Sequence, residues 1–595
     1  MRLAAKSWPV IALLLLSTPL ARAQEGPDPC DLTLGPIDLP SELRPDGSSG
    51  PQAGDPAVCE RRFRAETPGP SGLSSVRSMA IVTPSDRQAA AGLADYRAML
   101  LGGGWAEGPG QPLGDAAALF SGNDPAGGTY SAQLVFRRSR VVAVIEATGP
   151  ALAGSPGIVP NLAKVLDERI SLDLGIGVAN PVRRGSVWPA VVAPTIVGDA
   201  NLEAAPLLGE SLQLGGFSGL VSLDREGTRF VAVTDRGPVS ELASGDGRLM
   251  VMPLPAYTPS IVKLRLQDGQ LRVTERIGLR LPAGFGNPRT GTAFVTGLPN
   301  GDADAAAFDR TGRHRWGNDP DGLDPSGIAL DPRDGSYWIS EEYGPSILHV
   351  AADGTILLRL MPSGLAADAP GENVRMILPA ELARRRWGHG FAGLAVSPDG
   401  GRLVAIMESA LANPDGPAGE ASRIVRLVSL DLTAGEPRLD GLFLYLTQPY
   451  DQAGAAEQAA VKVGDVVALG PNRVLVAERD SADDSGYRTV FSVDLEPATN
   501  LLGQWDSAGP SPEQLGEHEL YRRGVRWAAK SPLVNLADLG WRLAALKGLA
   551  LVDESTIAVV NDNNFGFAGF DGSGALQPNG VPTRLTIVHL PGTLN

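Results

Sequence analysis

The stretch Arg229-Phe-Val-Ala-Val-Thr-Asp-Arg-Gly-Pro238 decides the fold, because its pattern occurs five times in the chain. It is a short apolar strand that ends in an acid, and it follows a first short strand, Phe217-Ser-Gly-Leu220, after a turn. The other copies pair Pro325-Ser-Gly-Ile with Tyr337-Trp-Ile-Ser-Glu-Glu, Phe391-Ala-Gly-Leu with Arg402-Leu-Val-Ala-Ile-Met-Glu, Val463-Gly-Asp-Val with Val474-Leu-Val-Ala-Glu-Arg-Asp, and Leu546-Lys-Gly-Leu with Ile557-Ala-Val-Val-Asn-Asp.

A third strand pattern follows several copies, and no helical pattern separates the strands. Repeats of several strands without intervening helices are typical of β-propeller blades. Five blades are visible, and the room between Pro238 and Asp324 allows a sixth. We expect the segment 189–214 to complete a blade begun at the C-terminus. A pair of stacked sheets is the alternative, because strand patterns alone do not fix closure.

The chain has 595 residues, too many for one hydrophobic core. A strand pattern at 75–84, a helix after Ser85 or Asp86, two strands within 129–147 and a helical pattern at 161–172 predict a small α+β domain before the repeat. The predicted fold class is therefore mainly β, a five- or six-bladed propeller preceded by a small α+β domain. The predicted boundaries are 1–23 for a signal peptide, 24–186 for an arm and the α+β domain, and 187–595 for the propeller.

The first residues predict export. Arg2 and Lys6 precede an apolar stretch at 8–20, and Ala21-Arg22-Ala23 is a small-x-small cleavage site. An uncleaved membrane anchor is the alternative, but the apolar stretch is short for a bilayer. No later segment approaches the length of a membrane helix. We therefore expect a periplasmic or secreted protein without a transmembrane segment.

Charge and cysteine usage agree with that expectation. The formal net charge is −16, and it becomes −19 once the three basic residues of the signal peptide are removed. Such a chain repels nucleic acid and anionic membrane surfaces but is compatible with binding cations. Cys30 and Cys59 are the two cysteines, and an isolated pair in an oxidising compartment predicts one disulfide.

Acids at the ends of the second strands form the candidate site. Equivalent positions of propeller blades converge on one axis, so we expect these acids to form a ring at one mouth of the channel. Carboxylates at close range repel, and a hard divalent cation such as calcium is one group that compensates them. Local salt bridges are the other, since Arg236 and Arg479 directly follow two of the acids. The predicted metal ligands are Asp235, Glu341, Glu408, Glu478 and Asp562.

Other catalytic patterns are weak. The five histidines show no metalloprotease spacing, and the sequence has no serine-nucleophile elbow and no P-loop. His389 stands just before a first strand, near the predicted rim. A lone histidine is more often structural, but its place makes it a candidate. We assign Arg236, Arg479 and His389 as candidate residues for binding an anionic substrate.

Four pairs of elements in the repeat carry a further signal: Gly219-Leu220 with Thr234-Asp-Arg-Gly-Pro238, Asp324-Pro325 with Ser340-Glu-Glu-Tyr-Gly-Pro345, Gly390-Phe391 with Gly393-Leu-Ala395, and Gly548-Leu-Ala550 with Val560-Asn-Asp-Asn563. By these elements the repeat resembles the phytase-like domain family known for "esterase-like activity of phytase". The resemblance covers about 210 to the C-terminus and implies a propeller of exported bacterial proteins that acts on phosphate or other esters, often with a metal. In that pattern a glutamate commonly precedes the Gly-Leu of several blades, whereas this sequence has Ser326, Ala392 and Lys547 there.

Two functions follow as hypotheses. The first is a metal-assisted hydrolase of phosphate or carboxylic esters, in which the metal polarises the ester or activates water. The second is a non-catalytic binding or scaffold propeller of the cell envelope, which the three departures favour. A small-molecule ester or phosphate is the expected ligand of the first. In the second, the N-terminal domain is the expected surface for a protein partner.

Overall fold

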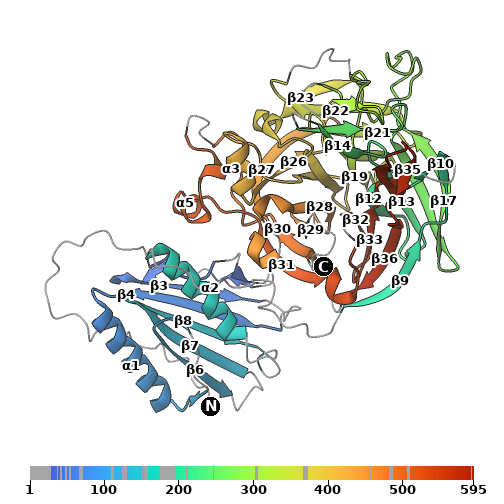
Figure 1. Cartoon of the computed structure of the whole chain (residues 1–595). Coiled ribbons are helices and arrows are strands. Elements are labelled where there is room, and N and C mark those ends of the chain that lie inside the picture. The colour runs from blue at the N-terminus through green and yellow to red at the C-terminus, as the bar shows by residue number, and fades with distance from the viewer. Residues whose placement is uncertain are drawn as a thin grey trace. The chain divides into compact units, whose positions relative to one another are not determined.

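The computed structural model divides the chain into two compact units, 1–191 and 192–595 (Figure 1). The predicted signal peptide lies outside the described residues. Among the described residues, no helix is long and apolar enough to cross a membrane. The structure describes residues 29–174 and 194–594 except for 36–37, 40–42, 47–49, 53–54, 66–71, 109–112, 124–129, 150–151, 153–157, 209–211, 245–246, 302–305, 366–372, 454–456, 481–486, 506–508, 544 and 591–592.

The first unit is a single antiparallel sheet with two helices. Its strand order is β1-β3-β4-β8-β7-β6-β5, and β2 pairs with β3. The helices are α1 (Asp86–Gly102), whose first turn is capped by Ser85, and α2 (Ile158–Asp173). The strands are β1 (Arg44–Pro45), β2 (Gly50–Gln52), β3 (Asp55–Arg64), β4 (Ser75–Val82), β5 (Ala106–Glu107), β6 (Ala116–Asn123), β7 (Tyr130–Arg138) and β8 (Val141–Thr148).

The two helices cover opposite faces of this sheet. Side chains alternate along a strand, so neighbours such as Leu134 and Val135 point to different faces. Leu134 belongs to the apolar cluster that contains Leu162 and Leu166 of α2. Val135 belongs to the cluster that contains Tyr96 of α1. The hydrophobic core of the first unit is therefore built in two layers, one on each side of the sheet.

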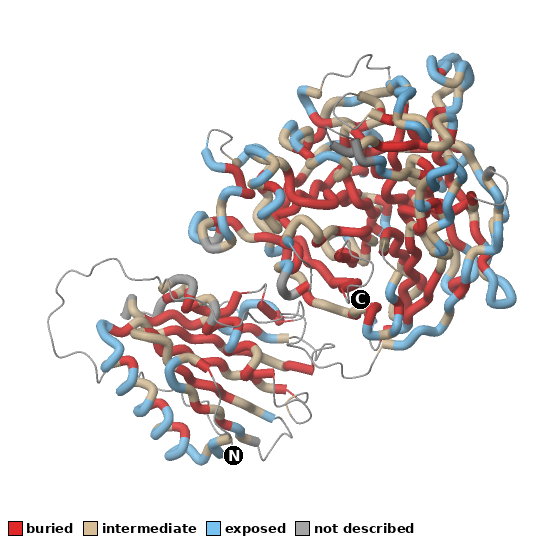
Figure 2. The backbone as a smooth tube through the Cα atoms, in the orientation of Figure 1, coloured by how far each residue is buried: buried red, intermediate tan, exposed pale blue. Residues whose placement is uncertain are grey.

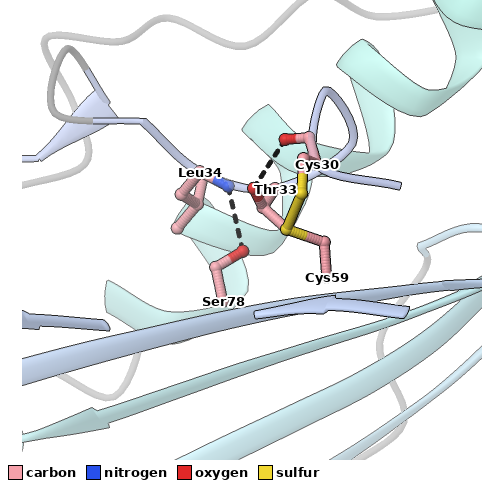
Figure 3. The surroundings of a disulfide bond; sticks show 5 residues. All are labelled: Cys30, Thr33, Leu34, Cys59 and Ser78. Carbon is pink, nitrogen blue, oxygen red and sulfur yellow. Dashed lines mark hydrogen bonds between the residues drawn. A yellow bond between two sulfur atoms is a disulfide. The ribbon is translucent and has the colours of Figure 1, made fainter. Parts of the chain in front are cut away.

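A disulfide joins Cys30 to Cys59 and attaches the segment before β1 to β3, as the sequence predicted (Figure 3). The same segment is held by backbone contacts, because Leu34 donates its N–H to the hydroxyl of Ser78 on β4 at 2.9 Å. Leu34 is buried in the apolar cluster under α2. The disulfide thus fixes a segment whose own apolar side chains complete the core.

The second unit is mainly β and contains five sheets of four or five strands. Each sheet begins with the strand pair that recurs in the sequence, and successive strands in the sheet are antiparallel neighbours. The sheets are β12-β13-β16-β17 (Phe217–Ser222, Arg229–Thr234, Ser260–Gln267, Gln270–Gly278), β19-β20-β21-β22-β23 (Pro325–Leu330, Tyr337–Glu341, Ser346–Val350, Ile356–Pro362, Val374–Leu378), β24-β25-β26-β27 (Phe391–Val396, Arg402–Met407, Ile424–Asp431, Arg438–Leu446), β28-β29-β30-β31 (Val461–Ala468, Arg473–Asp480, Arg488–Asp494, Ala529–Asn535) and β32-β33-β36-β9 (Ala545–Asp553, Thr556–Asp562, Arg584–His589, Thr195–Asn201). In the second of these sheets, β23 joins β22 in parallel.

The last sheet joins the two ends of the unit. β9 comes from the start of the unit and pairs antiparallel with β36 from its end, with Thr195 opposite His589 and Asn201 opposite Arg584. The sequence predicted this pairing for the segment 189–214. The region between Pro238 and Asp324 supplies β16 and β17 and a small sheet of β14 (Ser240–Ser244), β15 (Gly247–Val251) and β18 (Ala307–Phe308).

The first strands of the five sheets contact one another in a closed cycle, in the order β12, β19, β24, β28, β32 and back to β12. They are buried along most of their length (Figure 2). Together they line a central apolar cavity of about 110 Å³, to which every first strand contributes three consecutive residues. These lining residues are 220–222, 328–330, 394–396, 466–468 and 549–551.

The cycle is tightest where four of the five first strands have glycine. A Cβ on Gly219 would lie 2.6 Å from the backbone of Ile328, and a Cβ on Gly393 would lie 2.2 Å from the Asp465 carboxylate. Asp465 takes the corresponding place on the fifth strand, β28. Its two carboxylate oxygens accept the N–H groups of Val466 and Leu549, each at 2.8 Å. Burial raises the pKa of Asp465 well above its usual value.

Candidate active site at the mouth of the ring

The end of the ring where the first strands begin, which we call the mouth, has most of the long connections. They run over 235–259, 279–324, 379–390, 408–423, 447–460 and 563–583. At the other end the connections are mostly short turns such as 223–228, 268–269, 331–336 and 469–472, with 495–528 as the exception. Binding and catalytic residues are concentrated in loops that a rigid scaffold positions. The mouth is therefore the end of the ring that is built for a site.

Strand register decides which acids face the centre of the mouth. Thr234 pairs with Phe217 and Met407 pairs with Phe391, so Asp235 and Glu408 each follow the last paired residue. Asp562 is equivalent to them, because Asn561 pairs with Leu546. These three predicted acids share one position in their sheets.

Glu341 and Glu478 do not share that position. Glu341 pairs with Pro325 and Glu478 pairs with Val463, which places both of them one residue earlier than Asp235 and Glu408. A shift of one residue turns a side chain to the opposite face of the strand. The residues equivalent to Asp235 are Glu342 and Arg479, so the ring is made of four acids and one arginine.

The two displaced acids are buried among polar groups, those of Glu341 from its own sheet and those of Glu478 from its own sheet and from β27 of the neighbouring one. Glu341 accepts the N–H of Tyr343 at 3.1 Å and the hydroxyl of Ser346 at 3.0 Å. Glu478 accepts four hydrogen bonds and so organises the interior between β27, β29, β30 and β31. Its donors are Tyr445, Tyr487 (2.5 Å), the N–H of Gln448 (3.0 Å) and Lys530.

The acids of the ring are compensated by a lysine that enters from β32. Lys547 Nζ lies 2.9 Å from Glu342 Oε1 and 3.2 Å from Glu408 Oε1, and its side chain is only 10% exposed. Arg479 Nη2 lies 2.8 Å from the same oxygen of Glu408. An ammonium group thus lies between two of the ring carboxylates.

His389 completes the group, because its Nδ1 is hydrogen-bonded to Glu408 Oε2. Its Nε2 lies 3.5 Å from Nζ of Lys462, a residue of β28 that sequence reasoning missed. Lys462 pairs across the strands with Arg479. We call these eight residues the mouth cluster: Asp235, Glu342, Glu408, Arg479, Asp562, Lys547, Lys462 and His389.

Burial and charge shift the protonation of this cluster in opposite directions at its two sides. Burial, reinforced by Asp562, raises the pKa of Asp235 well above its usual value, and burial also raises the pKa of Asp562. Burial would raise the pKa of Glu408 as well, but Lys547, Lys462 and His389 together lower it well below its usual value. Burial lowers the pKa of His389 although Glu408 opposes the shift. The Glu408 side is therefore an ionised carboxylate beside a neutral imidazole.

The predicted substrate cations have partners within the protein. Arg236 is paired with Asp324, and Arg479 is paired with Glu408. Lys462, in contrast, has no carboxylate within 4.0 Å of its ammonium among the described residues, and its Nζ lies 3.5 Å from the His389 ring. Burial is the largest of the effects that lower the pKa of Lys462 to about 8. The positive charges of Arg479 and Lys547 also lower this pKa, whereas Glu408 opposes the shift.

The mouth does not fit the predicted five-acid calcium site. Two of its five predicted ligands point elsewhere, and the acids of the mouth do not bring three ligand atoms within 4.8 Å of one another in the described part of the chain. Lys547 supplies the positive charge that a cation would bring to Glu342 and Glu408.

A group with the residue types and spacing of a metal triad lies at the opposite end of the ring. Ligand atoms of Asp331, Asp334 and His349 all lie within 4.8 Å of one another. Each has a protein partner: Arg333 binds both oxygens of Asp331, and Ser336 contacts Asp334 and His349. The His349 ring also stacks on a tryptophan of β20. We interpret this group as the framework of the turn between β19 and β20.

Two solved structures share a distant likeness with the chain. The PQQ-bound aldose sugar dehydrogenase of Streptomyces coelicolor is 10% identical, with a TM-score of 0.27, and the match covers 67% of this chain and 100% of that one. The periplasmic gluconolactonase of Pseudomonas aeruginosa is 13% identical, with a TM-score of 0.23, and the match covers 63% and 88%. Likenesses this weak say nothing about substrate.

Sequence comparison is more informative. An "uncharacterized secreted protein" of Arthroderma benhamiae (strain ATCC MYA-4681 / CBS 112371) is 27% identical over 177 residues, and the match covers 27% of this chain and about a third (34%) of that protein. A family model described as "Esterase-like activity of phytase" matches residues 212–565, and Asp562 lies just before the end of this match. All eight residues of the cluster lie within this match, and so does most of the five-sheet ring. The chain therefore belongs to the Phytase-like family.

Proposed function

We propose that this protein is an exported ester hydrolase, that its five sheets are the blades of a five-bladed β-propeller, and that the mouth cluster is its active site. The observation that supports the catalytic proposal is the hydrogen bond between His389 Nδ1 and Glu408 Oε2. A carboxylate accepts hydrogen bonds only, so Nδ1 must carry the proton. The lone pair of the neutral ring is then on Nε2, the atom that accepts a proton from water once the Lys462 ammonium, 3.5 Å away, has moved aside.

The chemistry needs no group beyond these residues and water. His389 Nε2 removes a proton from water, and the hydroxide adds to the carbonyl carbon or phosphorus of the ester. The bond to the leaving alcohol then breaks, and the imidazolium returns its proton to the alcohol oxygen. Glu408 stabilises the imidazolium that forms in between, and Lys547 and Arg479 keep Glu408 ionised. Phosphate and carboxylic esters are both substrates that this scheme allows.

Location outside the cytoplasm is part of the proposal. It rests on the predicted signal peptide, on the disulfide of the first unit and on the secreted relative in the comparison. A periplasmic and an extracellular protein would both have these features.

The test is hydrolysis by the purified mature protein with aryl phosphates and aryl carboxylic esters as substrates. Loss of general-base catalysis in His389→Gln should lower kcat/KM by about 100- to 10,000-fold. His589→Gln is the matched control, because His589 is an exposed histidine of β36, away from the mouth cluster. Equal rates for His389→Gln and the wild type would contradict the assignment. If no ester in the panel is hydrolysed, the binding-propeller function is favoured instead.

A further inference from the structure

Positive charge is in excess on the Glu408 side of the mouth cluster. Three cations, Lys462, Arg479 and Lys547, lie there with two carboxylates, Glu342 and Glu408. Both carboxylates are already engaged, because Lys547 bridges them and Arg479 binds the second. Lys462 is the cation left without an anionic partner among the described residues.

The strand pairing makes this excess costly in the free protein. Lys462 on β28 lies directly opposite Arg479 on β29, and like charges in directly paired positions destabilise a sheet. Lys462 is also partly buried, and a buried ammonium without a partner is unfavourable. Binding of an anion would stabilise the unpaired Lys462 ammonium. This ammonium lies beside His389 Nε2, so the anion would bind next to that nitrogen.

We infer that Lys462 is the receptor for an oxyanion, so that the substrates of this site are esters carrying a phosphate or carboxylate group close to the bond that is cleaved. This inference deepens the proposed function and rests on it, because the bound oxyanion is part of a substrate only if the protein is a hydrolase. In the free protein Lys462 Nζ lies 3.5 Å from Nε2 of the His389 ring. An oxyanion bound to Lys462 draws the ammonium away from that nitrogen and leaves it open to water.

The protonation of Lys462 makes the receptor pH-dependent. The groups that face it are Glu408 after β25, Glu342 after β20, Arg479 on β29, Lys547 on β32 and the His389 ring. Because its pKa is lowered to about 8, Lys462 is charged at neutral pH and loses its charge under mildly alkaline conditions. Oxyanion binding should therefore weaken as the pH rises through about 8.

The experiment titrates inorganic phosphate, and in a second arm acetate, into the full mature chain by isothermal titration calorimetry at pH 7 and pH 9. A hydrogen bond to a charged group is lost in Lys462→Met, so phosphate or acetate should bind about 10- to 100-fold more weakly. Lys462→Arg keeps the charge and should stay within about threefold of the wild type. Lys263→Met, which removes a lysine of an exposed ion pair on β16, is the control and should bind like the wild type.

The two arms identify the source of the oxyanion, since preference for phosphate indicates phosphate esters and preference for acetate indicates carboxylate-bearing esters. A wild type that binds neither anion, or a Lys462→Met variant that binds them unchanged, overturns the inference. The melting temperature of Lys462→Met should be unchanged or higher, because a buried unpaired charge is removed, and this separates the effect from misfolding. Calorimetry needs no turnover, so phosphate binding through Lys462 without hydrolysis would refute the hydrolase and keep the receptor.

Discussion

Replacing Lys547 by methionine is the sharpest test of how the mouth cluster is held together. Methionine keeps much of the length of the side chain but removes the ammonium that bridges Glu342 and Glu408. Glu408 retains Arg479 and His389 as partners. The main loss therefore falls on Glu342, a carboxylate that is 7% exposed.

The size of the effect follows from the geometry. At 2.9 and 3.2 Å, each attraction to Lys547 is about 5–6 kcal/mol for an effective dielectric constant of about 20. The cost of desolvating the ammonium offsets much of this, and removing one partner of a buried pair costs about 3–5 kcal/mol. The second unit spans 192–595, and its unfolding entropy near the melting point is about 0.85 kcal/mol per kelvin. The melting temperature of that unit should fall by about 4–6 °C.

Differential scanning calorimetry of the mature chain measures this change. Lys263→Met, at an exposed pair, should shift the melting temperature by about 1 °C or less. Adding Glu342→Gln to Lys547→Met removes the unpaired carboxylate and should recover at least about half of the loss.

Calcium gives this experiment a second readout. Without the ammonium, the negative charges of Glu342 and Glu408 are no longer compensated by Lys547 and can attract a divalent cation. Calcium should therefore raise the melting temperature of Lys547→Met more than that of the wild type. The reasoning is refuted if Lys547→Met melts within about 1 °C of the wild type, or if the double variant is no more stable than the single one.

Three further predictions concern other parts of the molecule. The rate of hydrolysis should follow a bell-shaped pH profile. It should rise as His389 loses its proton, at a pKa below the usual value for histidine, and fall as Lys462 deprotonates at a pKa of about 8. A rate that stays constant from pH 5 to about 9 would contradict both roles. Glu478→Gln should lower the unfolding free energy of the second unit by about 3 kcal/mol in denaturant titrations and leave phosphate binding unchanged, whereas weakened binding would mean that Glu478 acts at the mouth. Reducing the bond between Cys30 and Cys59 should destabilise the first unit by about 3–4 kcal/mol and leave the melting of the second unit unchanged, and a shift in the second unit would show that the two are coupled.

Much of the ring was predictable because the five strand pairs share one sequence pattern, and strand pairs with the same pattern of apolar residues bury the same face. The error of one residue at Glu341 and Glu478 arose at strand ends, where adjacent polar residues compete for one position. Aligning the second strands by their first apolar residue removes it, since the position five residues later is the ring position in every copy. Those first residues are Phe230, Tyr337, Leu403, Val474 and Ile557, and the ring positions are Asp235, Glu342, Glu408, Arg479 and Asp562.

The chemistry of the mouth was harder to foresee than its place. His389 was a candidate because it precedes a first strand, but its hydrogen bond to Glu408 depends on the course of the loop that carries it. Lys462 gave no signal, because a lysine early in a strand is usually solvated. Its importance follows from lying opposite Arg479 and beside His389, which are contacts between segments far apart in the sequence.

The pairing of β9 with β36 has a consequence for biogenesis. Asn201 and Arg584, which meet in that sheet, are separated by 383 positions along the chain. Contacts of such long range form slowly, because the chain must close a large loop first. During synthesis or translocation, β9 therefore has no partner strand until β36 has emerged. Unpaired strand edges promote aggregation. The protein should depend on holding chaperones in the compartment where it folds, and prematurely terminated chains should be cleared by proteolysis.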